Sequence, residues 1–94
     1  MESWMVAYDI SDPKRLRRVA RACEDFGVRK QLSVFLVRVS ATEMEKLRGR
    51  LQRLIHHDED QVLFVPLCGK CVVRMEAMGR SMEAVDARDV VVVV

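Results

Sequence analysis

The sequence predicts a single α+β domain, because strand-like and helix-like patterns follow one another in the order strand, helix, strand, strand, helix, strand. The segments 4–9, 34–39 and 61–67 are rich in β-branched and aromatic side chains. The segments 13–26 and 41–55 repeat apolar side chains every three or four positions, which is the period of a helix. A chain of 94 residues is long enough for one domain. This order is that of the ferredoxin-like βαββαβ sandwich, an antiparallel sheet with both helices on one face.

The first helix is bounded by turn residues. The apolar strand before it ends at Asp9, and either Ser11 or Asp12 can cap the helix, with Pro13 at the first position, where a missing N–H removes no hydrogen bond. We expect Gly27 to end this helix. Its buried stripe is predicted from apolar side chains at helical spacing, namely Leu16, Val19, Ala20, Cys23 and Phe26.

Residues 28–39 are too many for one strand in a domain of this size. We therefore expect a short edge strand at residues 28–32, a sharp reversal near Ser33, and a central strand that ends at Val39. Ser40 and Glu43 form the sequence signature of a capping box, which predicts a second helix that reaches Ile55.

The second helix is followed by the acidic segment 58–60, which we interpret as a solvated turn. Residues 61–67 form the next predicted strand, and Pro66 implies an edge position in the sheet or a bulge, because proline cannot donate a ladder hydrogen bond. The domain is expected to cover residues 1–78. Residues 79–94 are expected to form a C-terminal segment with an additional strand at Val90–Val94 that pairs with a second protomer or a partner protein, because so apolar an edge would otherwise aggregate.

The sheet has a second face that the two helices do not cover. We expect Tyr8, Phe35 and Phe64 to lie on it, and these side chains are too apolar to leave in water. A second copy of the sheet is the simplest cover, which predicts a homodimer with two-fold symmetry. The sequence contains no apolar run long enough to span a membrane, and its N-terminus lacks the pattern of a secretion signal, so we expect a cytoplasmic protein with no membrane contact.

The three cysteines are an odd number, which fits a reducing compartment better than a disulfide scaffold. Cys68-Gly69-Lys70-Cys71 has the spacing of half a zinc site, but the sequence has no second such pair. The favoured interpretation is a pair of reduced structural thiols in a tight turn, with metal binding or redox chemistry as the alternatives.

Asp9 is the first candidate functional residue, since it is the only charged side chain between Trp4 and Ile10. A carboxylate at the end of a buried strand is costly unless water, a cation or hydrogen-bond donors reach it. Two interpretations of Asp9 stay open. In the first, its carboxylate caps the next helix or accepts hydrogen bonds from nearby backbone N–H groups. In the second, it is a ligand of a divalent cation. One carboxylate is too few for Mg²⁺, but two Asp9 side chains that meet across a dimer axis would suffice.

The first helix carries Lys14, Arg15, Arg17, Arg18 and Arg21 before any acidic residue, so these cations repel one another. Such a run is often only a solvated face, but a phosphate backbone explains it better. We predict nucleic-acid binding with little base specificity, because the sequence offers few aromatic residues for stacking. The predicted contacts are Arg15, Arg17, Arg18, Arg29 and Lys30.

Three motifs together resemble a known family. The segments 6–12 (Val-Ala-Tyr-Asp-Ile-Ser-Asp), 17–20 (Arg-Arg-Val-Ala) and 31–35 (Gln-Leu-Ser-Val-Phe) are similar to the small CRISPR-associated nucleases, the second of the two core proteins of spacer acquisition. The resemblance implies a ferredoxin-like homodimer in which the Asp9 carboxylates of both subunits bind one Mg²⁺ or Mn²⁺ and act in cleavage of RNA or DNA. It also implies assembly with the CRISPR-associated integrase on DNA. Tyr8, Ser11 and Phe35 are expected to support this site.

Three functional hypotheses remain open at this point. The first is a metal-dependent endonuclease with its site at a dimer interface. The second is a non-catalytic DNA-binding scaffold that spaces two integrase dimers, and the third is a generic ferredoxin-like RNA-binding or regulatory module. No histidine or lysine is close to Asp9 in the sequence, so hydrolysis would rely on metal-activated water with arginines stabilising the charge. The single candidate acid and the lack of a nearby base favour the non-catalytic scaffold over an efficient nuclease.

Overall fold

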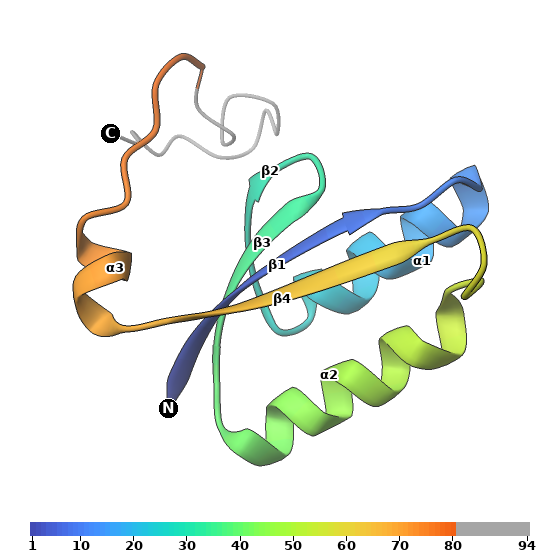
Figure 1. Ribbon diagram of the computed structural model, residues 1–94, viewed down its shortest axis with the longest axis horizontal. Helices are drawn as coiled ribbons and strands as arrows, with labels where there is room; N and C mark the ends of the chain where they lie inside the picture. Colours follow the sequence, from blue (N-terminus) through green and yellow to red (C-terminus); the bar gives the residue numbers. More distant parts are fainter. Residues whose placement is uncertain (81–94) are drawn as a thin grey trace.

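The structure is a computed structural model that describes residues 1–80 (Figure 1). Its elements in chain order are β1 (Glu2–Asp9), α1 (Pro13–Glu24), β2 (Gly27–Gln31), β3 (Val34–Val39), α2 (Ala41–Leu54), β4 (Gln61–Leu67) and α3 (Gly69–Val73). The predicted order of strands and helices is confirmed, and α3 is a short addition to it. The predicted strand at Val90–Val94 lies outside the described residues, as does all but the beginning of the predicted segment 79–94.

The four strands of the described residues form one antiparallel sheet in the order β2-β3-β1-β4. The reversal predicted near Ser33 is confirmed, since β2 and β3 pair directly on either side of it. Of the two alternatives predicted from Pro66, the edge position is confirmed, because β4 pairs only with β1 in this sheet. Both long helices cover the same face of the sheet (Figure 1). The architecture is therefore the predicted ferredoxin-like sandwich.

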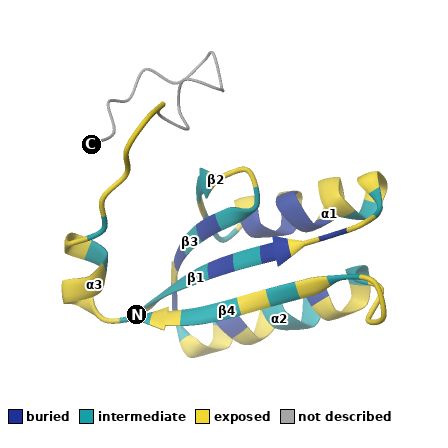
Figure 2. Ribbon diagram, turned by 45° about the horizontal axis from the view of Figure 1, so that its top comes forward, coloured by how far each residue is buried: buried dark blue, intermediate teal, exposed yellow. Residues whose placement is uncertain are grey.

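The core lies between this face and the two helices (Figure 2). Tyr8 and Phe35 are buried in it and Phe64 packs against it, so the prediction that these three cover the opposite face is wrong. Successive residues of a strand point to opposite faces, and the helices happen to lie on the side of the even-numbered residues of β1. The buried residues of the core are Val6, Tyr8, Ile10, Val19, Ala20, Ala22, Cys23, Phe35, Val37, Val39, Met44, Leu47 and Leu51.

The opposite face of the sheet has no helix over it among the described residues (Figure 1). It is nevertheless apolar, because the residues that alternate with the core positions are also hydrophobic. Leu63 of β4 is 53% exposed and Val28 of β2 is 57% exposed. We call this surface the open face, and it consists of Met5, Ala7, Val28, Leu36, Leu63 and Val65.

The boundaries of α1 follow from specific contacts. Asp12 is the N-cap, and its carboxylate accepts a hydrogen bond of 2.9 Å from the backbone N–H of Arg15. The helix ends at Glu24, so the prediction that Gly27 terminates it is wrong. Gly27 is instead the first residue of β2, where a Cβ atom would lie 2.5 Å from Val37 Cγ1 and closer still to the Leu36 carbonyl oxygen. The absence of a side chain there allows β2 to approach β3.

The second helix begins with the predicted capping box. The Ser40 hydroxyl accepts a hydrogen bond of 3.1 Å from the backbone N–H of Glu43, and the Glu43 carboxylate accepts one of 2.9 Å from the backbone N–H of Ser40. In α1, by contrast, Leu16 is 36% exposed, so its predicted place in the buried stripe is wrong. Every helix of residues 1–80 is too short or too polar to cross a lipid bilayer.

Candidate functional site

Asp9 is the last residue of β1 and is exposed to solvent. Its neighbour Tyr8 points into the core, so the alternation of the strand places the Asp9 side chain on the open face. Within residues 1–80 its carboxylate makes no hydrogen bond and no ion pair. The helix-capping alternative for Asp9 is not supported, because Asp12 caps α1. The carboxylate is thus available to a ligand from outside the chain.

Two of the three motifs that carry the family resemblance, 6–12 and 31–35, lie side by side in the fold. The backbone N–H of Tyr8 donates a hydrogen bond of 3.0 Å to the carbonyl oxygen of Ser33, and the Tyr8 hydroxyl donates one of 3.2 Å to the carbonyl oxygen of Leu32. The rings of Tyr8 and Phe35 stack with their centroids 6.2 Å apart. Burial raises the pKa of the Tyr8 hydroxyl. These contacts fix the end of β1 against the β2–β3 turn and so hold the backbone at Asp9.

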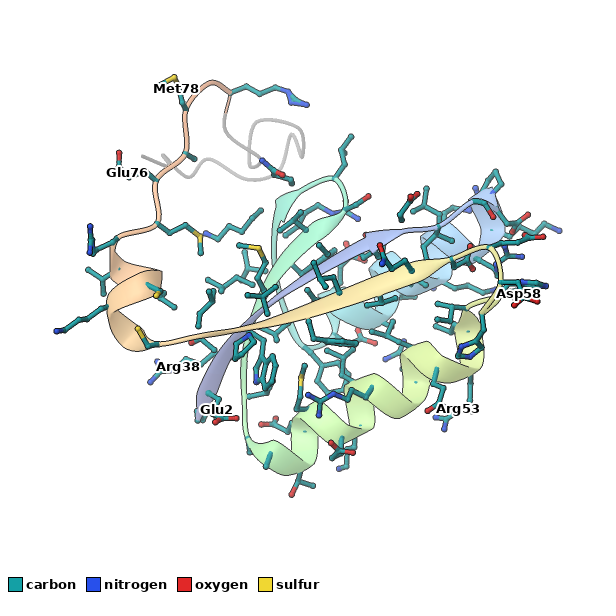
Figure 3. All side chains as sticks on the ribbon, in the orientation of Figure 1. Glu2, Arg38, Arg53, Asp58, Glu76 and Met78 are labelled. Carbon is teal, nitrogen blue, oxygen red and sulfur yellow. The ribbon has the colours of Figure 1, made fainter. Side chains whose placement is uncertain are left out.

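Ser11 and Arg15 belong to a cluster around Asp60, whose side chain is 0% exposed. The Asp60 carboxylate accepts hydrogen bonds from Arg15 Nε at 2.8 Å, from the backbone N–H of His56 at 2.8 Å and from the backbone N–H of Ser11 at 3.0 Å. The guanidinium of Arg15 holds the pKa of Asp60 well below its usual range. The prediction that residues 58–60 form only a solvated turn is therefore wrong for Asp60, although Asp58 is exposed and points outward (Figure 3).

This cluster changes how Arg15 is interpreted. Its guanidinium also contacts Glu59 Oε1 at 3.1 Å, and only 22% of its side chain is exposed. The cluster thereby joins the first turn of α1 to the turn between α2 and β4. Arg15 has a structural role that the sequence did not reveal, while a contact from it to nucleic acid stays a prediction.

The remaining cations of α1 form a stripe along its solvent side. Lys14, Arg17, Arg18 and Arg21 are exposed, and their spacing of three and four residues places them on one face of the helix, where they line a shallow groove. None of them makes an ion pair within residues 1–80, where the ion pairs use other arginines. We call these four residues the cationic stripe. It can accept a polyanion without first breaking an ion pair within residues 1–80.

Arg29 and Lys30 lie on β2 and are half-buried. The guanidinium carbon of Arg29 is 5.1 Å from the centroid of the Phe35 ring, which is a cation–π contact. Its Nε is buried and has no hydrogen-bond partner among the described residues. Both residues stay predicted contacts for nucleic acid, but neither extends the cationic stripe of α1.

The described residues of one chain do not supply enough ligands for the predicted metal site. No group of three or more histidine, cysteine, aspartate or glutamate side chains able to hold a metal ion occurs in residues 1–80. Asp9 is a hard oxygen ligand of the type that Mg²⁺ and Mn²⁺ prefer, and it is accessible. The residue fits such an ion only if further ligands come from a second copy of the chain, from water or from phosphate.

Comparison with known proteins adds a decisive observation. The family model for "CRISPR associated protein Cas2" matches residues 1–75. The chain belongs to the Cas2 family. The family resemblance found in the sequence is therefore confirmed.

Two relatives illustrate the similarity. A protein of Rhodospirillum rubrum named CRISPR-associated endoribonuclease Cas2 4 is 35% identical over 83 residues, which cover 88% of this chain and 67% of the relative. A protein of Synechocystis named CRISPR-associated endoribonuclease Cas2 3 is 33% identical over 76 residues, which cover 81% of this chain and 83% of the relative. Both names assign a nuclease activity to those proteins.

Solved structures agree with the fold. The crystal structure of Streptococcus pyogenes Cas2 superposes with a TM-score of 0.77 at 35% identity, covering 82% of this chain and 99% of that one. A chain of a partial complex described as Cas6-RT-Cas1 with Cas2 superposes with a TM-score of 0.72, covering 83% of this chain and 91% of that one. Its sequence identity of 21% supports the shared fold only.

Proposed function

We propose that this chain is a CRISPR adaptation protein that acts in spacer acquisition as a homodimer, binds nucleic acid and cleaves RNA or DNA phosphodiesters with a divalent cation. The observation that carries the proposal is the exposed Asp9 carboxylate, which has no partner in residues 1–80 and lies in a chain of the Cas2 family. Relatives at 33–35% identity are named endoribonucleases. Cytoplasmic location is part of the proposal and rests on the odd number of cysteines, which fits a reducing compartment.

The homodimer is supported by the open face. Leu63 and Val28 are more than half exposed, and Met5, Leu36 and Val65 extend the same apolar surface. A small domain gains most from burying such a surface against a second copy. Since Asp9 lies on this face, two open faces in contact around a two-fold axis would bring the two Asp9 carboxylates toward one another.

A metal site at this axis would use Asp9 from both subunits as its protein ligands. When bound, Mg²⁺ or Mn²⁺ would supply a polarised water and neutralise phosphate charge. The chain itself contributes the carboxylate and the rigid support behind it, namely the Tyr8–Phe35 stack and the hydrogen bonds from Tyr8 to the β2–β3 turn. This support holds the backbone that carries the carboxylate, which suits Mg²⁺ because its coordination geometry is strict.

The cationic stripe supplies the nucleic-acid contact in this proposal. Four exposed cations without an ion pair in residues 1–80 suit a sequence-independent phosphate backbone. Assembly with the CRISPR-associated integrase is also proposed. It rests on family membership and on a structure of the same fold that is found in a complex with Cas1.

A second function is favoured by one observation. Within residues 1–80, the Asp9 carboxylate makes no hydrogen bond or ion pair with a side chain that could act with it as an acid or base. A chain that only binds duplex DNA and spaces the integrase would need the cationic stripe and the dimer, and would not need Asp9 chemistry. This non-catalytic scaffold is the alternative to the nuclease.

The two functions are separated by Asp9→Asn, with Asp58→Asn as the matched control because Asp58 is also an exposed aspartate and lies in the α2–β4 turn. We expect Asp9→Asn to abolish Mg²⁺-dependent cleavage of RNA and DNA while folding and duplex binding persist, and Asp58→Asn to leave all three unchanged. Cleavage by pure Asp9→Asn protein equal to that of the wild type would refute the nuclease site and favour the scaffold.

A mixed dimer tests whether the site is shared between subunits. One wild-type and one Asp9→Asn subunit, purified with two different affinity tags, would keep about half of the activity if each subunit had an independent site. A single site that uses both carboxylates should lose nearly all of it. Half activity in the mixed dimer would therefore contradict the shared metal site, even if the pure variant is inactive.

A further inference from the structure

Two exposed thiols lie next to each other at the end of the sheet that is remote from Asp9. Cys68 follows β4 directly and is the N-cap residue of α3, and Cys71 lies in the first turn of that helix. Both are exposed and free. Asp9 pairs with Gln61 at the start of β4, so the seven residues from there to Cys68 separate the thiols from Asp9 by roughly 23 Å along the strand. The nuclease proposal makes no use of them.

The distance between the two sulfur atoms is short enough for bond formation. Cys68 Sγ donates to Cys71 Sγ at 3.3 Å, whereas a disulfide bond needs about 2.05 Å. Closing this gap requires only a small movement of two side chains. The surroundings permit that movement, because no residue of α3 is buried.

The arrangement favours redox chemistry over metal binding. Within residues 1–80, no further histidine, cysteine, aspartate or glutamate joins the two thiols in a cluster of potential metal ligands. A structural zinc site requires four ligands, and this pair supplies two. A dithiol needs no additional ligand to close on itself.

We propose that Cys68 and Cys71 are a reversible dithiol–disulfide pair that exchanges with low-molecular-weight disulfides. The Cys68 thiolate attacks one sulfur of the disulfide RS–SR, which forms a Cys68–S–SR bond and releases the thiolate RS⁻. Cys71 then gives up its proton and attacks the Cys68 sulfur, which forms the Cys68–Cys71 bond and releases the second RS⁻. Two electrons pass from the protein to RS–SR, and the two protons of the cysteines leave with the two thiol products.

The roles of the two cysteines differ because their surroundings differ. The pKa of Cys68 is lowered most by the nearby backbone N–H of Cys71 and further by the Cys71 thiol. The Cys68 side chain does not cap α3 through a hydrogen bond. Once Cys68 is a thiolate, Cys71 donates its S–H to it, and this hydrogen bond raises the pKa of Cys71. Attack begins with the thiolate, so Cys68 is the attacking and Cys71 the resolving residue.

The third cysteine is a control within the same chain. Cys23 is 0% exposed in the core, and burial raises its pKa to about 12. It should react with neither disulfides nor alkylating reagents while the protein is folded.

The test treats the full chain with excess oxidised glutathione under native conditions, alkylates the remaining thiols and maps them by mass spectrometry. Trypsin cleaves after Lys70, between the two cysteines, so a disulfide would join peptides 54–70 and 71–74, which separate when reduced. We expect this linked pair, with a loss of about two mass units, and its reversal by reduced glutathione. Cys23 should remain unmodified throughout.

Two variants identify the roles. In Cys71→Ser, the mixed disulfide cannot be resolved, so a stable glutathione adduct of about 305 Da should accumulate on Cys68. In Cys68→Ser, a stable adduct should likewise form on Cys71, because no second thiol resolves it and the thiol that raises the pKa of Cys71 is gone. The order of attack is read in the wild type, where acid quenching after a brief treatment should trap the first glutathione adduct on Cys68. Both side chains are exposed, and circular dichroism would verify that the variants fold.

Three outcomes would overturn the proposal. The first is full alkylation of Cys68 and Cys71 after treatment with excess oxidised glutathione. The second is a disulfide between two chains in place of the linked peptide pair. The third is a first glutathione adduct on Cys71 in the acid-quenched wild type, which would contradict the assigned order of attack. None of these outcomes bears on cleavage at Asp9.

Discussion

Neutralising two cations of the stripe is expected to weaken nucleic-acid binding in a way that depends on salt. The perturbation is the double variant Arg17→Gln and Arg18→Gln. Both arginines are exposed and make no ion pair within residues 1–80, so their replacement breaks no ion pair of the described residues. Glutamine has nearly the same helix propensity as arginine, so α1 should remain intact.

The size of the effect follows from the number of cations in the stripe. If each of the four residues neutralises one phosphate, the slope of log K against log salt is about −3.6 per subunit, and it becomes about −1.8 when two are removed. Raising salt from about 50 to 200 mM would then weaken wild-type binding about 150-fold per subunit and the variant only about 12-fold. Two subunits on one duplex would double both slopes.

The assay is fluorescence anisotropy of labelled duplexes of unrelated sequence over a series of salt concentrations. The matched control is the double variant Lys46→Gln and Arg53→Gln, which removes the same charge from exposed positions on α2, where Arg53 projects away from the sheet (Figure 3). We expect equal losses on all duplexes for the stripe variant and a nearly unchanged slope for the control. An unchanged slope for the stripe variant, or an equal flattening by the control, would refute the role assigned to the stripe.

Two stability predictions follow from the fold. Arg15 lowers the pKa of Asp60 in the folded state, so Asp60 stabilises the protein above its unfolded pKa of about 3.8 and loses this contribution as the pH falls toward the folded pKa. In urea unfolding, Asp60→Asn should be less stable than the wild type at pH 7, and the difference should narrow below pH 3.8. A difference that does not depend on pH would contradict this prediction. Gly27→Ala should destabilise the protein by about 1–3 kcal/mol because its Cβ would collide with β3. In α2, a Cβ atom at Gly49 would meet only Arg53 Nη1, at 3.6 Å, so Gly49→Ala should stabilise the protein by about 0.4–1 kcal/mol. Equal effects of the two alanine substitutions on thermal unfolding would refute the collision at Gly27.

Local patterns in the sequence predicted most of the fold. The Ser40–Glu43 capping box, the reversal at Ser33 and the edge position of Pro66 are each determined by residues within a few positions of one another. Such signals are readable because the hydrogen bonds or steric limits behind them are local. The exposure of Asp9 at the end of its strand was predictable for the same reason.

Contacts between distant residues were not predictable. Arg15 and Asp60 are 45 residues apart, and nothing in the acidic segment 58–60 distinguishes the buried carboxylate from its exposed neighbours. Gly27 was interpreted as a helix terminator because it follows a helical pattern. Its actual role depends on Leu36 and Val37 of the neighbouring strand, a pairing that the local sequence does not show. The orientation of β1 was ambiguous because both of its faces are apolar.

The orientation of β1 also bears on how binding and cleavage are related. Because Tyr8 is buried beneath the helices, Asp9 must point to the open face, whereas the cationic stripe lies on the outer side of α1, across the sheet. Within one chain, a nucleic acid held by the stripe is therefore separated from the Asp9 carboxylate by the helix layer and the sheet. Binding and cleavage should then respond to different substitutions, and an Asp9→Asn dimer should retain full affinity and the full salt slope. Because of this separation, the cationic stripe could bind nucleic acid in either a nuclease or a scaffold. Cleavage would in addition require the nucleic-acid strand to reach the edge where the two open faces meet.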